Sequence, residues 1–223
     1  MQKFDTPAPV SAFLDIPVGR VSFIAADRTD TTVEILPADP AKARDVKLAE
    51  RIEVGYADGV LRIETPAPKN RILGSSGAVE ITVQLPAGSR VEAKAAGAEL
   101  RGVGRLGDVA FHGAQGSVKL DETANARLSL QAGDIAVGRL GGDAELSTQK
   151  GDIEVAEAVR GTVTLSTQAG SLSIAAARGV SAFLDAGTTL GRIRNSLSNT
   201  DGATPALSIH ATTSVGDITA RSL

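Results

Sequence analysis

The chain has 223 residues, of which 42% are hydrophobic and only 3% aromatic, and its formal net charge is −3. A charge this close to zero predicts no nucleic-acid partner and no attraction to an anionic membrane. The sequence contains no cysteine, which excludes a disulfide, a thiolate nucleophile and a cysteine metal site.

The N-terminal stretch has no apolar run long enough for a signal peptide before Asp15 and Pro17 interrupt it. No run of apolar residues reaches the roughly 18 that a membrane-spanning helix requires, so no transmembrane segment is expected. We therefore expect a cytoplasmic protein.

Short alternating runs before residue 90 predict strands. Between Pro37 and Glu50 the sequence favours a short helix, with Asp39 as its cap and Pro40 at its first position. Residues 65–77 mix Pro, Gly, Ser and Asn and predict a loop. The expected strands are 10–16, 20–26, 31–36, 51–55, 60–64 and 78–85.

Three successive units between residues 126 and 174 carry a glycine at the same point, at Gly133, Gly151 and Gly170. In each unit the residues 7 and 5 before the glycine, and those 2 and 4 after it, are apolar. A period of two belongs to a β-strand, and glycine permits the bend between two strands. The same template fits at Gly19, Gly59, Gly116 and Gly216.

A repeat of this length with two strands is typical of a solenoid. We therefore predict an all-β fold, a single-chain parallel β-solenoid (β-helix-like) with coils of about 17–19 residues and glycine-centred turns. One domain should cover residues 1–223, less regular over 1–90 and built of regular coils over 91–223. No helix is expected after Val91, and 195–205 should form a polar loop.

Several motifs resemble the DUF4097 family of bacterial proteins, also labelled "putative adhesins". The motifs are VGRVSF, DGVLRIE, VEITVQLPAGSRVE, QAGDIAV, QKGDIEV, QAGSLSI and VGDITA, and the resemblance covers nearly the whole chain. The resemblance implies a single-chain β-solenoid and carries over no catalytic residue. Many relatives are secreted or membrane-tethered, whereas this sequence shows no signal or anchor.

Two motifs could suggest a ligand site. Gly102, Gly104 and Gly107 make a literal GxGxxG, but the alternating, glycine-containing sequence after it favours solenoid turns over a dinucleotide site. Four aspartates follow turn glycines and could form an acidic column that binds calcium. One carboxylate per coil is few for calcium, so turn aspartates that accept backbone N–H bonds are the favoured interpretation. These aspartates are Asp108, Asp134, Asp152 and Asp217.

Polar columns recur before the turns, and stacking them about 4.8 Å apart would allow hydroxyl and amide ladders. Stability is the favoured role of these columns, with polysaccharide binding as the alternative. They comprise Ser129, Ser147 and Ser166, and Gln131, Gln149 and Gln168. His112 and His210 alternate with apolar residues and should point outward, so we expect no catalytic residue, no metal site and no cofactor.

The sequence therefore predicts a non-catalytic scaffold or protein-binding solenoid. The final coil should expose an unpaired edge that associates with a second copy or with a partner strand, because charge is scarce there and no capping helix is expected. The residues proposed for this edge are Leu207, Ile209, Thr212, Thr213, Ile218 and Leu223. Two alternatives are a surface adhesin that binds polysaccharide and, less favoured, a β-helix enzyme that acts on polysaccharide.

Overall fold

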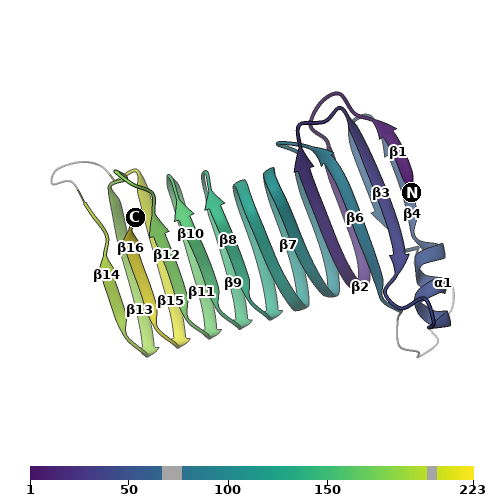
Figure 1. The fold of residues 1–223 in the computed structure, drawn as a ribbon. Coiled ribbons are helices and arrows are strands. Elements are labelled where there is room, and N and C mark those ends of the chain that lie inside the picture. Colours follow the sequence, from purple (N-terminus) through teal and green to yellow (C-terminus); the bar gives the residue numbers. More distant parts are fainter. Residues whose placement is uncertain (67–76, 200–204) are drawn as a thin grey trace.

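The computed structural model describes residues 1–66, 77–199 and 205–223. These residues form one 16-stranded sheet, and α1 (Ala43–Arg51) is the only helix within those ranges (Figure 1). The all-β expectation is confirmed.

The regular part is an elongated stack in which the chain runs along one wall, bends, and returns along the other (Figure 1). The long strand β7 continues from one wall into the other: its residues 126–132 pair with β9 and its residues 118–123 pair with β8. One wall is a parallel ladder in the order β7, β9, β11, β15, β13. The other is a parallel ladder in the order β7, β8, β10, β12, β16, β14. The strands are β7 (Arg90–Ala132), β8 (Ile135–Leu140), β9 (Ala144–Lys150), β10 (Ile153–Ala158), β11 (Gly161–Ala169), β12 (Leu172–Ala176), β13 (Ala182–Leu190), β14 (Ile193–Ser196), β15 (Leu207–Val215) and β16 (Ile218–Ser222).

The N-terminal part departs from a parallel solenoid, because the sheet there is mixed. Strand β2 pairs in parallel with β7 on one side and with β5 and β6 on the other, whereas the β1–β3, β3–β6 and β4–β5 pairs are antiparallel. Asp58 and Gly59, with φ values of 50° and 77°, form the two-residue turn that makes β4 and β5 a hairpin. The strands are β1 (Gln2–Asp5), β2 (Ser11–Ala26), β3 (Asp30–Pro37), β4 (Glu53–Ala57), β5 (Val60–Glu64) and β6 (Val79–Pro86).

Three local expectations need correction. The strands expected at 10–16 and 20–26 are continuous as β2, although residues 11–15 pair with β5 and residues 19–26 pair with β6. The helix begins at Ala43, after a turn in which Asp39 accepts the Ala41 N–H. Residues 195 and 196 belong to β14 instead of a loop. The remainder of that expected loop at 200–204, and most of the loop at 65–77, lie outside the described residues.

The glycine-centred template identifies the core. Of its 28 apolar positions, 27 are buried and Val54 is half-buried. Leu146 aligns with Leu128 on one neighbouring strand and Leu165 on the other. The expected stacking register is confirmed.

The bends require glycine for two reasons. Gly151 has φ +147°, a conformation that L side chains rarely adopt, and a Cβ added there would lie 2.1 Å from the Gly133 carbonyl oxygen. Successive bends therefore pack backbone against backbone.

The last two coils stack in the reverse of their chain order. β15 and β16 lie between β11/β12 and β13/β14, so the earlier strands β13 and β14 form the end of the stack (Figure 1). The bends agree with this order, because Gly191 of the β13–β14 coil packs on Gly216, which packs on Gly170.

Candidate functional site

The residues proposed for the terminal edge lie in an interior coil, so that expectation is wrong about which coil ends the stack. Leu207, Ile209 and Ile218 are fully buried, because both β15 and β16 have a strand on each side. Thr213 donates its hydroxyl to the Gly170 carbonyl at 3.1 Å. Thr212 points outward and Leu223 is half-exposed, so neither lies at a free strand edge.

At the C-terminal end of the stack the free edges belong to β13 and β14, which we call the end coil; at the opposite end the edge strands are β1 and β4. β13 pairs only with β15, and β14 pairs only with β16, within the described ranges 1–66, 77–199 and 205–223. Each strand therefore presents a row of backbone N–H and C=O groups without a strand partner on its outer side.

The apolar core is open at the end coil. Leu184 and Ala186 align with the buried Ile209 and Ala211 but are only half-buried, and Ile193 is 45% exposed. On the outer face of the same strands Phe183 and Leu190 are 49% and 66% exposed. Large apolar side chains exposed together on one surface are typical of an interaction site.

The opposite end of the stack is covered. Helix α1 packs against β3 and β6, and it buries Leu48. Phe4 and Tyr56 add a ring contact with centroids 5.5 Å apart. Of the two ends that the structure describes, only this one has a helix packed against it.

The covered end also carries a tight charge cluster. Asp30 accepts hydrogen bonds from Arg28 at 2.8 Å and pairs with Lys3 at 3.0 Å. The Arg28 guanidinium, followed by the Lys3 ammonium, lowers the pKa of Asp30 to about 2. This cluster joins β1 to β3 and stabilises the first antiparallel pair.

Three of the four turn aspartates accept backbone N–H bonds, which is the interpretation that the sequence favoured. Asp134 accepts the Asp152 N–H at 2.9 Å, Asp152 accepts the Ser171 N–H at 2.7 Å, and Asp217 accepts the Arg192 N–H at 2.9 Å. Asp108 belongs to another corner, where it accepts from the Asn125 side chain at 2.7 Å. No cluster of His, Cys, Asp or Glu in the described part of the chain could hold a metal ion.

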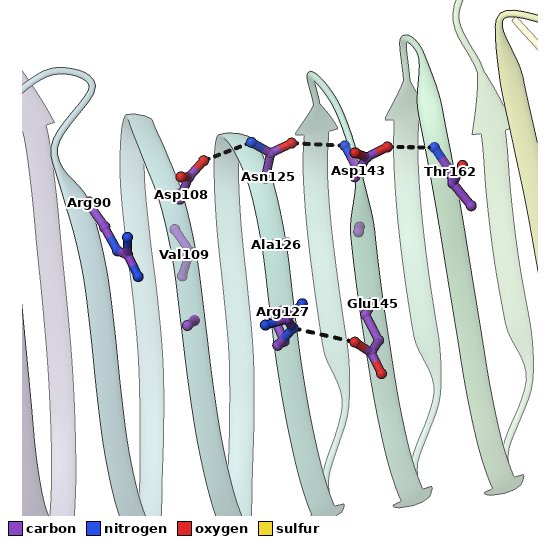
Figure 2. Close-up of a pocket in the computed structure, with 11 residues that line it drawn as sticks. Arg90, Asp108, Val109, Asn125, Ala126, Arg127, Asp143, Glu145 and Thr162 are labelled. Carbon is purple, nitrogen blue, oxygen red and sulfur yellow. Dashed lines mark hydrogen bonds and ion pairs between the residues drawn. The ribbon is translucent and has the colours of Figure 1, made fainter.

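Figure 2 shows that second corner beside a shallow depression of about 290 Å³. The side-chain Oδ1 of Asn125 accepts the Asp143 N–H at 2.9 Å, and the Asp143 carboxylate accepts the Thr162 N–H at 2.8 Å. Below this ladder Arg127 lies 3.3 Å from Glu145. The charged side chains are thus engaged with one another, and the depression offers no nucleophile paired with a base.

Threonines, which the sequence analysis did not single out, line the inside of the bends. Thr148 donates to the Gly133 carbonyl at 3.1 Å, and Thr167 donates to Gly151 at 3.1 Å. Each lies three residues before its turn glycine, next to the serine column. Ser129, Ser147 and Ser166 align in register and the three glutamines are exposed, but no side-chain hydrogen bond joins the members of either column in the part of the chain that the structure describes. The sequence signal for hydroxyl groups stacked along the bends was therefore present in these threonines, one position after the serines.

The remaining motifs give no site. Gly102, Gly104 and Gly107 lie within β7 and precede no helix, so the GxGxxG is a solenoid segment. His112 is exposed, and His210 is exposed with Nδ1 at 3.4 Å from an Asp185 carboxylate oxygen. No helix in the described residues is long and apolar enough to cross a bilayer.

The family model described as Toastrack DUF4097 matches residues 15–222. The chain belongs to the DUF4097 family. No curated protein matches it. Among solved structures, the DUF4097 chain is similar to a "putative adhesin" from Bacteroides fragilis, with 13% identity, a TM-score of 0.48, and coverage of 98% of this chain and 95% of that one.

Two structures from Parabacteroides distasonis are similar to the same extent. One is a "putative adhesin" with 14% identity and a TM-score of 0.49, and it is matched over 98% of this chain and 95% of its own. The other is a "putative lipid binding protein" with 13% identity and a TM-score of 0.45, at the same coverage.

Proposed function

We propose that this protein is a non-catalytic β-solenoid scaffold that binds a protein partner at its end coil. The observation that carries the proposal is the open end: two free strand edges flank an apolar core that is buried everywhere else along the ladders. A partner that supplies strands to these edges would satisfy the backbone groups and cover the apolar side chains together.

The rest of the stack suits a scaffold. Each coil contacts chiefly its neighbours, and the ladders of bend residues tie successive coils through side-chain to backbone hydrogen bonds. Such a stack holds its two ends at a fixed distance and orientation. A partner bound at the end coil is then held at a fixed position relative to the opposite end of the stack.

The absence of catalysis is likewise our proposal. The exposed His210–Asp185 contact is the one histidine–carboxylate pair in the described ranges, and no hydroxyl group bonds to that histidine there. A hydrolase or lyase would need a nucleophile or base in a cleft that excludes water, and the depression of Figure 2 is shallow and lined by ion-paired side chains.

A surface adhesin that binds polysaccharide is the alternative, with the polar depression around Arg90 and Arg127 as its site. It requires export, whereas we propose a cytoplasmic location. Fractionation of the native host and a glycan array would favour the adhesin if the protein were found outside the cell and bound sugar.

The test is capture of partners from native lysate by three forms of the protein. Ile193→Lys places a charge in the open core, and Leu36→Lys is the matched control, because Leu36 is a comparably exposed apolar residue (49%) on β3 at the covered end. We expect wild type and the Leu36 variant to bind the same protein, and the Ile193 variant to lose it. Equal binding by all three forms, or no binding by any, would overturn the proposal.

A further inference from the structure

The end coil restricts the shape of its partner. β13 and β14 are the ends of two different ladders, and stacked sheets lie about 10 Å apart. A single extended peptide could pair with one of these edges and would leave the other edge and the core exposed. The partner must therefore present two strands with apolar side chains between them, which is what another end coil presents.

We propose that the end coil binds the end coil of a second copy of this chain, about a two-fold axis that crosses both walls. β13 then pairs antiparallel with β13 of the second copy, and β14 with β14. The proposal rests on the proposed function, since it names the partner of that same site.

Strand lengths favour an axis that crosses both walls over an axis parallel to the strands. β13 has nine residues and β14 has four. Pairing like with like joins strands of equal length, and on β14 an axis at Asn195 leaves only Ile193 opposite a residue outside the strand, Leu197. A two-fold axis parallel to the strands would instead pair nine residues with four, and would leave backbone groups of β13 unpaired.

The free backbone groups can be assigned from the bonds made on the inner side. The Leu190 carbonyl accepts the Gly216 N–H, and the Arg192 carbonyl accepts the Ile218 N–H, both at 2.9 Å. Because successive residues of a strand direct their backbone groups to opposite sides, and the Ser181 carbonyl accepts the Leu207 N–H on the inner side, Leu184 and Ala186 on β13 and Asn195 on β14 direct theirs outward. A second copy would meet free donors and acceptors on both strands.

Asn195 marks the centre of the β14 pair. It aligns with the buried Ala220, at a position that is apolar in the other regular coils. Its Oδ1 accepts the Leu197 N–H at 3.0 Å, and its Nδ2 has no hydrogen-bond partner within the described residues. Next to a two-fold axis, each Asn195 Nδ2 can donate to Oδ1 of the other copy. A single polar residue in an apolar interface is a known means of fixing register.

The arginines near β14 also favour a two-fold axis at Asn195. Arg192 and Arg194 carry like charges on and beside β14. An axis at Ile193 would place each Arg194 opposite Arg192 of the other copy, which is destabilising across antiparallel strands. An axis at Asn195 places Arg194 opposite Ser196 instead. No lysine follows Lys150 in the sequence, so the edge also lacks the residue that most often prevents such pairing.

Single-cysteine variants test the register, because the chain has no cysteine of its own. Directly opposed residues of a hydrogen-bonded antiparallel pair lie about 5.5 Å apart between Cα atoms, within the range that a disulfide spans. We expect Asn195→Cys to give a disulfide-linked dimer under mild oxidation. Ile193→Cys and the mid-stack control Gln149→Cys should stay uncrosslinked.

Light scattering after size exclusion tests the association itself. Wild type and Leu36→Lys should elute as a dimer, and Ile193→Lys should be a monomer of 22.7 kDa. If Ile193→Lys fails to fold, Gly187→Lys replaces it, because a Cβ at Gly187 meets nothing within 4 Å in the monomer.

A wild-type protein that is monomeric at high micromolar concentration would overturn the inference, as would crosslinking at residue 193 without crosslinking at 195. If that monomer still captured another protein through an Ile193-dependent surface, the proposed function would stand and the second copy would be excluded as its partner.

Discussion

Replacing Leu146 with alanine tests the stacked core most directly. Leu146 is fully buried and lies in register between Leu128 and Leu165. Removing its branched methyl groups loses transfer free energy and leaves a cavity, which together cost about 2–5 kcal/mol in protein cores. We expect the upper part of this range, about 3–5 kcal/mol, because the hydrogen-bonded ladders on both sides hold the backbone apart at about 4.8 Å and prevent collapse.

The assay is thermal unfolding with urea unfolding as a second measure. A loss of about 3–5 kcal/mol should lower Tm by roughly 10 °C in a chain of this size. Glu154→Ala is the control, because Glu154 is exposed and points out of the neighbouring wall. A change below about 1 kcal/mol for Leu146→Ala, similar to that of an exposed substitution, would refute the register of the core.

Three further predictions concern the bends and the charges. Gly151→Ala should cost about 2–4 kcal/mol, because both φ and space exclude a Cβ, whereas Gly187→Ala should be nearly neutral by the same unfolding assay. The pKa of Asp30 is lowered to about 2, so its stabilisation is complete above the unfolded pKa of about 3.9 and is lost as pH falls towards 2. The Tm of Asp30→Asn should therefore fall less than that of wild type between pH 4 and pH 2. Millimolar calcium should leave Tm unchanged; a rise above about 3 °C that Asp134→Asn with Asp152→Asn abolishes would contradict this.

Much of the fold could be predicted because its physical determinants are local. Alternation within a few residues marks which side chains are buried, and a glycine marks a bend that no other residue can make. Leu128, Leu146 and Leu165 align because each lies five residues before its glycine. Three of the four turn aspartates were likewise interpreted correctly, since Asp134, Asp152 and Asp217 accept a backbone N–H of the adjacent coil, whereas Asp108 accepts from the Asn125 side chain.

The arrangement of the coils at the end was not predictable in the same way. Strands β13 and β15 have compatible patterns, and nothing in the alternation says which of them lies next to β11. The template does fit at Gly191, where it selects Leu184, Ala186 and Ile193, and the one polar residue it selects is Asn195. That exception was the available sign that this coil, instead of the last one, ends the stack. The Asp58–Gly59 hairpin was similarly visible as a dipeptide but was assigned to a coil bend.

The reversed coil order also affects how the chain can fold as it is synthesised. β13 and β14 leave the ribosome before β15 and β16, when β11 and β12 still lack a strand on the side away from β9 and β10. Because β15 aligns Gly161 on one side with Ala182 on the other, β13 can pair with β11 directly and without a change of register. A shorter stack with β13 on β11 would have to reopen to admit residues 207–222. That conversion would insert β15 and β16 between strands already paired, at a rate set by how readily the end coil detaches.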